Sequence, residues 1–247
     1  MNSYKLHEID GVEIPFSNEW KNIAISVSGG ADSALLSYLL CELSGPNTNI
    51  HIISNIRMWK SRPWQQYDGI KVYEYLKNAF PSLNFIRHSN FIAPDLEYGF
   101  IGHSIKDEYN KMVSGDNIQI RAYAEFVCFH NKIDAYYNGV TRNPRYVSFK
   151  HMGMDRRDVE LNETNSHLQL TTHMGVLVSH PFRFIEKSWV IKQYKEKDLM
   201  NFLNITRSCE GDFDNLDYTN YVPYQEVPEC GKCFWCKERE WAIEQNK

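Results

Sequence analysis

The sequence predicts an α/β fold built around a doubly wound parallel sheet. Strand-like and helix-like segments alternate through residues 22–140, and the first strand runs directly into a glycine- and serine-rich loop that opens a helix. Strands separated by helices are joined by right-handed crossovers, which make neighbouring strands parallel. With 247 residues, 43% of them hydrophobic, the chain is long enough to bury a substantial core.

Short apolar runs predict the strands, and apolar residues at helical spacing predict the helices. The first helix is closed by Gly45 and Pro46 and the second by Pro81, all of which are stop signals. The predicted strands are residues 22–27, 50–54, 83–88 and 134–140, and the predicted helices are residues 32–45, 66–81, 117–133 and 187–203. Residues 89–115 show no clean period and are predicted as a loop or insertion, and the polar residues 141–178 carry no assignment.

Composition excludes several classes of protein. The net charge of −4 does not provide the basic surface that coats nucleic acid, so a nucleic-acid partner is not expected. No apolar run approaches the roughly 20 residues that span a bilayer, so no membrane partner is expected either. The N-terminus lacks the apolar core of a signal peptide, and we expect a cytoplasmic protein. In that compartment, six cysteines indicate metal binding or catalysis rather than disulfides.

The loop between the first strand and the first helix has the features of a phosphate site. A helix N-terminus offers free backbone N–H groups and a partial positive charge, glycines allow close approach, and the serine hydroxyls add donors. Asp32 would repel a bare phosphate, but it is accounted for if Mg²⁺ bridges it to the phosphates or if it caps the helix. An ordinary serine-rich turn is the alternative. The predicted phosphate-binding residues are Ser28, Gly29, Gly30, Ala31, Asp32 and Ser33.

This loop lacks the Gly-Lys-Ser/Thr of a Walker A loop and the glycine pattern of dinucleotide-binding proteins. The string SGGADS instead resembles the signature of the PP-loop ATP pyrophosphatases, which have a Rossmann-like adenine nucleotide α-hydrolase-like fold. The resemblance implies that ATP is cleaved to AMP and pyrophosphate, with adenylation of an acid or an amide oxygen, and it makes Asp32 and Ser33 catalytic. It also implies that adenine lies near Asn55, after the second strand, and that Gly139 lets the base or ribose approach. Both are equally well read as turn residues.

A second motif, CGKCFWC, lies near the C-terminus. Its C-x2-C-x2-C spacing lets three thiolates from one turn converge on a tetrahedral metal, and Cys209 is the obvious fourth ligand. A closed four-cysteine site is structural, whereas an iron–sulfur cluster, a redox thiol pair and free cysteines are the alternatives. Cys41 and Cys128 lie among apolar residues and are predicted to pack in the core. The predicted Zn²⁺ ligands are Cys209, Cys230, Cys233 and Cys236.

The two motifs together resemble the 7-cyano-7-deazaguanine synthase family. The passages SVSGGADS, HPFRFIEKSWVIKQYKEKDLMNFL and SCEG…ECGKCFWCKERE carry the resemblance. It matches Pro181, Lys187 and Cys209 to the family's Pro, Lys and Cys, and it makes Lys187 a catalytic residue that holds pyrophosphate. We expect an ATP-binding domain at residues 1–180 and a helical, zinc-binding region at residues 181–247.

What the resemblance implies is a nitrile-forming ligase that uses ATP, Mg²⁺ and Zn²⁺. Its substrates would be 7-carboxy-7-deazaguanine and ammonia, joined through an acyl-adenylate. An amide would form first, and a second ATP would convert it to the nitrile. A homodimer is also implied.

Three departures leave the acceptor open. The loop between Cys209 and Cys230 is longer than the family's, and the segment after the fourth strand, where a deazaguanine would be read, is replaced. The family's Gly-Arg-Asn stretch is not matched either, and Arg121 is the nearest equivalent for cofactor binding. A related adenylating enzyme acting on a tRNA base, a deazaguanine derivative or a protein is therefore an alternative. A non-catalytic nucleotide-binding protein is another.

The polar segment after the fourth strand supplies further candidates. Residues 142–157 are expected either to close over the substrate, with Arg156 or Arg157 near its carboxylate or phosphates, or to form a solvated loop. Trp59, Trp64 and Tyr67 are expected either to stack on a purine-like ring or to pack in the core. Five scattered histidines lack metal-like spacing and are not expected to be ligands: His103, His151, His167, His173 and His180.

Overall fold

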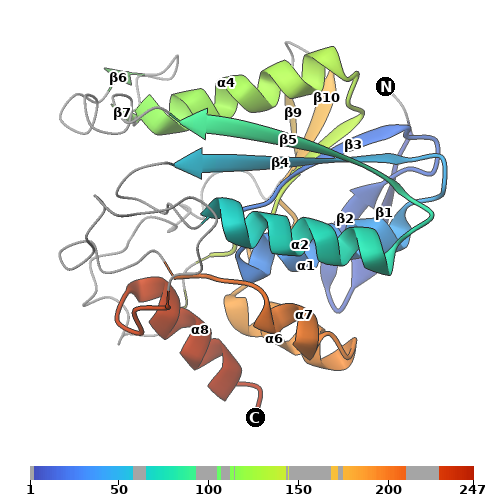
Figure 1. Ribbon diagram of the computed structural model, residues 1–247. Coiled ribbons are helices and arrows are strands. Elements are labelled where there is room, and N and C mark those ends of the chain that lie inside the picture. Colours follow the sequence, from blue (N-terminus) through green and yellow to red (C-terminus); the bar gives the residue numbers. More distant parts are fainter. Residues whose placement is uncertain are drawn as a thin grey trace.

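A six-stranded sheet forms the centre of the molecule (Figure 1). The computed structural model describes residues 3–57, 65–92, 105–106, 112–113, 115–142, 144, 168–171, 175–209 and 228–247. The strands of this sheet are β3 (Asn22–Ser26), β4 (Asn49–Arg57), β5 (Asn84–Ile92), β8 (Ala135–Asn138), β9 (Leu168–Thr171) and β10 (Val176–Ser179). Their order is β5-β4-β3-β8-β10-β9, and only β9 runs antiparallel to its neighbour.

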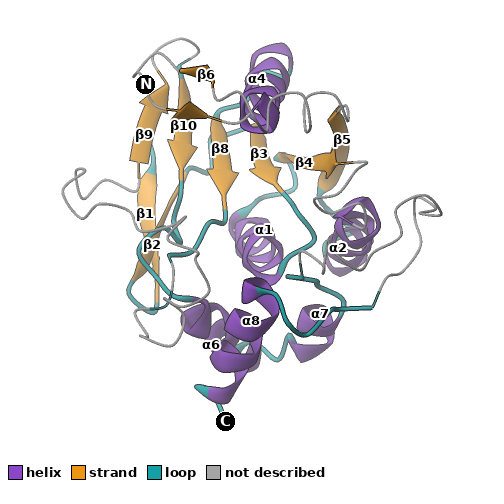
Figure 2. Ribbon diagram, turned by 90° about the vertical axis from the view of Figure 1, so that its left-hand side faces the viewer, coloured by secondary structure: helices purple, strands orange, loops and turns teal. Residues whose placement is uncertain are grey.

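Helices cover both faces of the sheet, which confirms the predicted doubly wound α/β fold (Figure 2). The helices are α1 (Ala31–Leu43), α2 (Gln65–Ala79), α4 (Gly115–His130), α6 (Lys187–Glu196), α7 (Met200–Asn204) and α8 (Phe234–Glu244). Helices α1 and α2 lie on one face and α4 on the other, while α6, α7 and α8 lie outside α1. Because β4 and β8 flank β3 on opposite sides, the strand order reverses there, and a crevice opens at the carboxyl ends of these strands.

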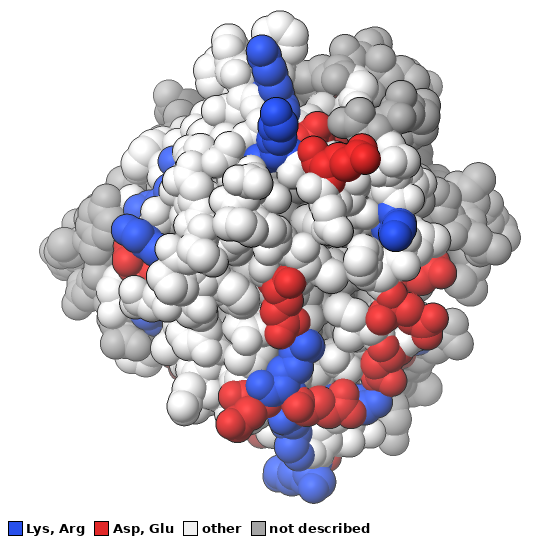
Figure 3. Space-filling model, turned by 90° about the vertical axis from the view of Figure 1, so that its right-hand side faces the viewer, with Lys and Arg blue, Asp and Glu red and all other residues white. Residues whose placement is uncertain are grey.

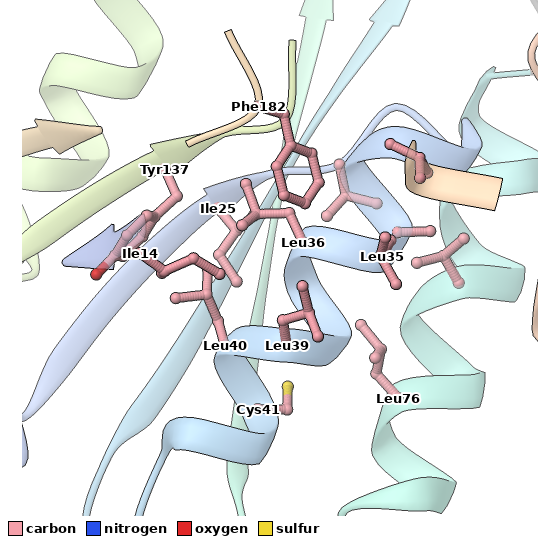
Figure 4. Close-up of a cluster of buried hydrophobic side chains, with 14 of the residues drawn as sticks. Ile14, Ile25, Leu35, Leu36, Leu39, Leu40, Cys41, Leu76, Tyr137 and Phe182 are labelled. Carbon is pink, nitrogen blue, oxygen red and sulfur yellow. The ribbon is translucent and has the colours of Figure 1, made fainter. Parts of the chain in front are cut away.

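The larger hydrophobic core lies between the sheet and helices α1 and α2. Figure 4 shows side chains from β2, β3, α1 and β8 meeting there, among them Ile25, Leu36 and Tyr137. Buried residues of α6, α7 and α8, such as Tyr194 and Ala242, belong to the same cluster. The C-terminal helices thus share the core of the sheet, and the division at residue 180 stays a prediction.

An N-terminal hairpin, which the sequence analysis did not predict, packs against this core. It consists of β1 (Lys5–Ile9) and β2 (Val12–Phe16), paired antiparallel. Asp10 and Gly11 join them with φ values of 47° and 78°. Positive φ at both central residues is the geometry of a tight hairpin turn, for which Asp-Gly is a strong sequence signal. The Asp-Gly pair is thus a sequence signal for this hairpin, and the hairpin places Ile14 and Phe16 in the core.

The single helix predicted over residues 187–203 is wrong, because two helices, α6 and α7, occupy this segment. Asp198 adopts a left-handed conformation with φ 55°. The N–H of Asp198 donates to the carbonyl of Lys195 at 3.2 Å, and the N–H of Leu199 donates to the carbonyl of Tyr194 at 2.8 Å. This pair of hydrogen bonds is the Schellman motif that ends a helix, and it turns Leu199 into the core.

The two segments without predicted structure contain short strands. Strands β9 and β10 lie within or at the end of the unassigned residues 141–178, and β5 extends to Ile92. Within the predicted loop 89–115, β6 (Ile105–Lys106) pairs with β7 (Met112–Val113) in a separate small sheet. Strands of two to four residues are too short to show a period in the sequence.

The outer surface agrees with the charge balance of the chain. On the face drawn in Figure 3, acidic and basic side chains lie interspersed among uncharged ones and form no continuous basic stripe. Among the described residues, no helix combines the length and the apolar composition needed to cross a membrane. The cytoplasmic location and the homodimer stay predictions.

Candidate functional site

A cavity of about 340 Å³ lies at the carboxyl ends of β3, β4 and β8. Its volume falls in the range of about 300–1,000 Å³ that is typical of small-molecule sites. Seven of the residues predicted to bind ATP or act in catalysis line it: Ser28, Gly30, Asp32, Ser33, Asn55, Gly139 and Lys187. The structure therefore brings most of the predicted nucleotide site together, at the point where the strand order reverses.

The loop after β3 is held in shape by its own side chains and by α2. The backbone N–H of Ser28 donates to Ser33 Oγ at 3.2 Å, and the N–H of Gly30 donates to Ser28 Oγ at 3.3 Å. Gly29 has φ +81°, and a Cβ there would lie 2.5 Å from the Cβ of Asp68. Gly29 is thus required by backbone conformation and by the close approach of α2. Gly29 and Ala31 do not line the cavity, and Ala31 is buried beneath the loop.

A buried ionic cluster lies beside the loop. The ammonium Nζ of Lys187, the first residue of α6, lies 3.0 and 2.9 Å from the two carboxylate oxygens of Asp32. On its other side, Glu238 Oε2 from α8 lies 3.3 Å from the same nitrogen. Thr141 Oγ1 also donates to Asp32 Oδ2 at 3.2 Å. Because the Lys187 side chain is only 3% exposed, its charge is tolerated there through these carboxylates.

Glu238 was not predicted as a site residue. Its carboxylate is fully buried, at 0% exposure. Phe234, Glu238 and Ala242 recur every four residues on α8, and all three are buried. A carboxylate on the apolar stripe of a helix indicates a buried charged partner, and this signal could have identified Glu238 from the sequence.

Two amide side chains line the cavity near the ends of β4 and β8, namely Asn55 and Asn138. Asn55 Oδ1 accepts a hydrogen bond from Asn90 Nδ2 at 2.8 Å. Gln65, a second residue that the sequence analysis missed, lines the cavity from the start of α2 and is 6% exposed. Its Oε1 is buried and has no hydrogen-bond partner among the residues that the structure describes, so it can accept a hydrogen bond from a ligand.

Gly139 lines the cavity, but it also has a second role. A Cβ at this position would lie 2.9 Å from Ser33 Cα and 3.0 Å from the Asp32 carbonyl oxygen. The first turn of α1 therefore occupies the space that a side chain would need. The predicted approach of a base or ribose at Gly139 stays a prediction, whereas the need for glycine follows from packing.

Other predicted residues lie away from the cavity. Arg121 is 57% exposed and pairs with Glu125 at 3.0 Å on α4, while the preceding residue, Ile120, is the one that lines the cavity. The ring of Tyr67 lies under Lys71 Nζ, 4.6 Å from it, and is not on the cavity wall. Several predicted positions fall outside the described residues: Trp59, Trp64, Arg156, Arg157, His103, His151, His167 and His173. His180 is described, and burial together with the charge of Arg183 lowers its pKa.

The four cysteines predicted as ligands converge. Their sulfur atoms all lie within 4.8 Å of one another. The backbone N–H of Cys230 donates to Cys209 Sγ at 3.3 Å, and that of Cys233 donates to Cys230 Sγ at 3.3 Å. Hydrogen bonds from Cys209 and Cys236 lower the pKa of Cys233 to about 4, so a thiolate is favoured there. Four such sulfurs fit a tetrahedral Zn²⁺ and also suit an iron–sulfur cluster, so the donor set does not decide between the two.

The cysteine cluster and the cavity share a wall. Cys209 lines the cavity, together with Arg207 and Trp235, and the backbone N–H of Arg207 donates to the carbonyl of Gly29 at 2.8 Å. The two other cysteines lie elsewhere in the core, as predicted, and burial raises the pKa of Cys128 to about 12. Among the described residues, the four clustered cysteines form the one group of three or more His, Cys, Asp or Glu side chains that could hold a metal ion.

No protein-family model matches the chain, and no curated protein matches it either. Among solved structures, it is similar to the U34-tRNA thiolase NcsA from Methanococcus maripaludis with its [4Fe-4S] cluster. That likeness has 18% identity, a TM-score of 0.48, and coverage of 93% of this chain and 68% of that chain.

Two further solved structures show weaker overall likeness. The NH3-dependent NAD synthetase from Campylobacter jejuni has 18% identity and a TM-score of 0.43, over 75% of this chain and 68% of that chain. The NMN synthetase from Francisella tularensis has 14% identity and a TM-score of 0.41, over 92% of this chain and 86% of that chain. At these identities the likeness assigns no role to any single residue.

Proposed function

We propose that the chain is an adenylating enzyme that binds Mg·ATP in the cavity and cleaves it between the α- and β-phosphates. One observation carries this proposal. The SGGADS loop lies at the carboxyl end of β3, on the wall of a cavity that also contains Lys187 and Arg207. A helix N-terminus, hydroxyl donors and two cationic side chains around one cavity form a site for a polyphosphate.

In the proposed reaction, an oxygen of the acceptor attacks the α-phosphorus as the bond from that phosphorus to pyrophosphate breaks. The acceptor is thereby adenylated. Ser28 and Ser33 would orient the phosphates, and Lys187 and Arg207 would neutralise the charge that develops on the leaving pyrophosphate. Asp32 would hold Mg²⁺, which supplies further charge neutralisation when bound. Positioning and charge stabilisation account for this reaction without a covalent nucleophile on the protein.

Product analysis tests this proposal. Wild-type protein incubated with Mg·ATP and an acceptor should release AMP and pyrophosphate, measured by chromatography and a pyrophosphate assay. Asp32→Asn should lose about 100-fold or more in rate, the size of effect typical when a charge-stabilising group is removed. Asp10→Asn changes an exposed carboxylate paired with Lys192 and should leave the rate unchanged. Release of ADP and phosphate, or equal rates in both variants, would contradict the proposal.

The acceptor is proposed on the resemblance described above. A 7-carboxy-7-deazaguanine with ammonia is the first candidate, and it would give an amide and then a nitrile. A different acceptor, such as a tRNA base or a protein, is the second candidate, because residues 141–178 depart from the deazaguanine family's pattern. Mass spectrometry after incubation with 7-carboxy-7-deazaguanine and ammonium separates the two, since only the first predicts a nitrile product.

For the metal, we propose Zn²⁺ at the four cysteines. A closed set of four thiolates joined by backbone N–H···S hydrogen bonds suits a structural zinc with no open position. Elemental analysis of purified protein should find about one zinc per chain. Iron together with acid-labile sulfide would instead identify an iron–sulfur cluster.

A further inference from the structure

Two connections join the cysteine cluster to the phosphate loop. The first runs along the chain, because Cys209 lies two residues after Arg207, whose N–H donates to the carbonyl of Gly29 at 2.8 Å. The second runs through α8. This helix begins directly after Cys233 and carries Cys236 in its first turn. Glu238 follows two residues later and lies against Lys187.

We propose that the metal at the cysteine cluster and Mg·ATP at the phosphate loop each strengthen the binding of the other, and that Glu238 is the positioning residue that couples them. The inference rests on the proposed ATP-binding function and adds a mode of regulation to that same site. Coupling between two sites is reciprocal, so the same factor must appear in both affinities.

The ionic cluster gives the physical reason. In the structure, Lys187 Nζ lies between the carboxylates of Asp32, at 2.9 Å, and Glu238, at 3.3 Å. When Asp32 turns to Mg²⁺, Lys187 loses one counter-ion and keeps the other only if Glu238 stays in place. Without Glu238, the buried ammonium would retain Asp32, because an unpaired buried charge is strongly unfavourable. Mg·ATP would then have to compete with Lys187 for the Asp32 carboxylate.

The cysteine cluster controls where Glu238 lies. Helix α8 has 11 residues, and Ala242 in its C-terminal half packs in the main core. The cysteine cluster therefore acts on its first turn, because helix ends fray where they lack support. Two of the four clustered sulfurs belong to Cys233, which precedes α8, and Cys236, in its first turn. A metal bound there fixes the turn from which Glu238 projects, and through it the position of Lys187.

The test uses zinc-loaded, full-length protein and two binding measurements. Calorimetry gives the affinity for α,β-methylene-ATP with Mg²⁺, an analogue that resists cleavage at the α-phosphate. Transfer of zinc to a chromophoric chelator, with and without this analogue, gives the effect of nucleotide on metal retention. Glu238→Gln removes the charge beside Lys187. The control is Glu240→Gln on the same helix, where the carboxylate is 59% exposed and pairs with Lys237.

In wild type and Glu240→Gln, bound nucleotide should raise the affinity of the protein for zinc, measured by competition with the chelator, by at least about fivefold. Zinc-loaded protein should likewise bind the analogue at least about fivefold more tightly than metal-free protein. In Glu238→Gln, each effect should fall below about twofold. If Glu238→Gln does not fold, Glu238→Asp takes its place in the test. This variant keeps the charge on a shorter side chain and should show partial coupling.

Three results would overturn the inference. In wild type, zinc retention that is independent of bound nucleotide would show that the sites are not coupled, whatever the variants do. Coupling in Glu238→Gln equal to that in Glu240→Gln would remove Glu238 from the pathway. Failure of zinc-loaded wild type to bind the analogue at all would reject the proposed nucleotide site as well, so the two failures are distinguishable.

Discussion

Replacing Gly139 with alanine would place a methyl group where the first turn of α1 already lies. The added Cβ would be 2.9 Å from Ser33 Cα, 3.0 Å from the Asp32 carbonyl oxygen and 3.0 Å from the Ser33 nitrogen. All three are backbone atoms, so no side-chain rotation relieves the overlap. Ordinary contacts need about 3.5–4.0 Å, and the start of α1 must therefore shift by roughly 0.5–1 Å. Such overpacking costs about 1–3 kcal/mol.

Thermal unfolding and calorimetric nucleotide binding measure the two consequences. For a chain of this size, 1 kcal/mol corresponds to about 2–4 °C in Tm, so Gly139→Ala should lower the Tm by about 2–12 °C. The same shift displaces the phosphate loop, so affinity for Mg·ATP should also fall. Gly45→Ala is the matched control, because its Cβ would meet no atom within 4 Å. That variant should keep the wild-type affinity and a Tm at or slightly above the wild-type value.

One outcome would refute this reasoning. If Gly139→Ala kept the Tm of the wild type and lost only nucleotide affinity, the glycine would serve the approach of a ligand rather than the packing of α1. The expectation from the sequence would then be right, and the steric explanation would be wrong.

The remaining predictions concern the buried charges, the cysteines and one histidine. Lys187→Met removes the ammonium beside the buried Glu238 carboxylate and should lower the free energy of unfolding by about 3–5 kcal/mol in a denaturant titration; a loss below about 1 kcal/mol would argue against a buried pair. Cys233→Ser should abolish metal binding and reduce helicity, whereas Cys128→Ser should retain the metal, as measured by elemental analysis and circular dichroism. Retained metal in Cys233→Ser would exclude it as a ligand. Burial, with a smaller effect of a neighbouring histidine, lowers the pKa of His51 from 6.5 to about 4. The unfolded chain binds more protons between these values, so stability should rise with pH from about 4 to 6.5 and then level off. Burial also lowers the pKa values of His88 and His180, which add to the rise. His51→Gln should therefore reduce the slope without removing it, and an unchanged slope would show that His51 does not contribute.

Local patterns in the sequence were sufficient for most of the fold. The alternation of strand and helix predicted the parallel sheet, and the helix predicted at residues 32–45 corresponds to α1 (Ala31–Leu43). The break between α6 and α7 could not be predicted in this way. The pattern is amphipathic on both sides of the break, and Asp198 adopts the left-handed conformation that glycine usually signals.

The candidate functional residues also divide into those that local sequence patterns predict and those that only the tertiary structure reveals. The sequence by itself was sufficient to predict the proposed phosphate-binding loop and three of the four clustered cysteines, because the residues of each motif are neighbours in the chain and their spacing encodes their geometry. Only the tertiary structure decided that Lys187 meets Asp32, 155 positions away, that Glu238 joins them, and that Ile120 rather than Arg121 faces the cavity. Contacts between distant segments depend on how helices pack across a common core, and no local pattern records which side chains will meet there.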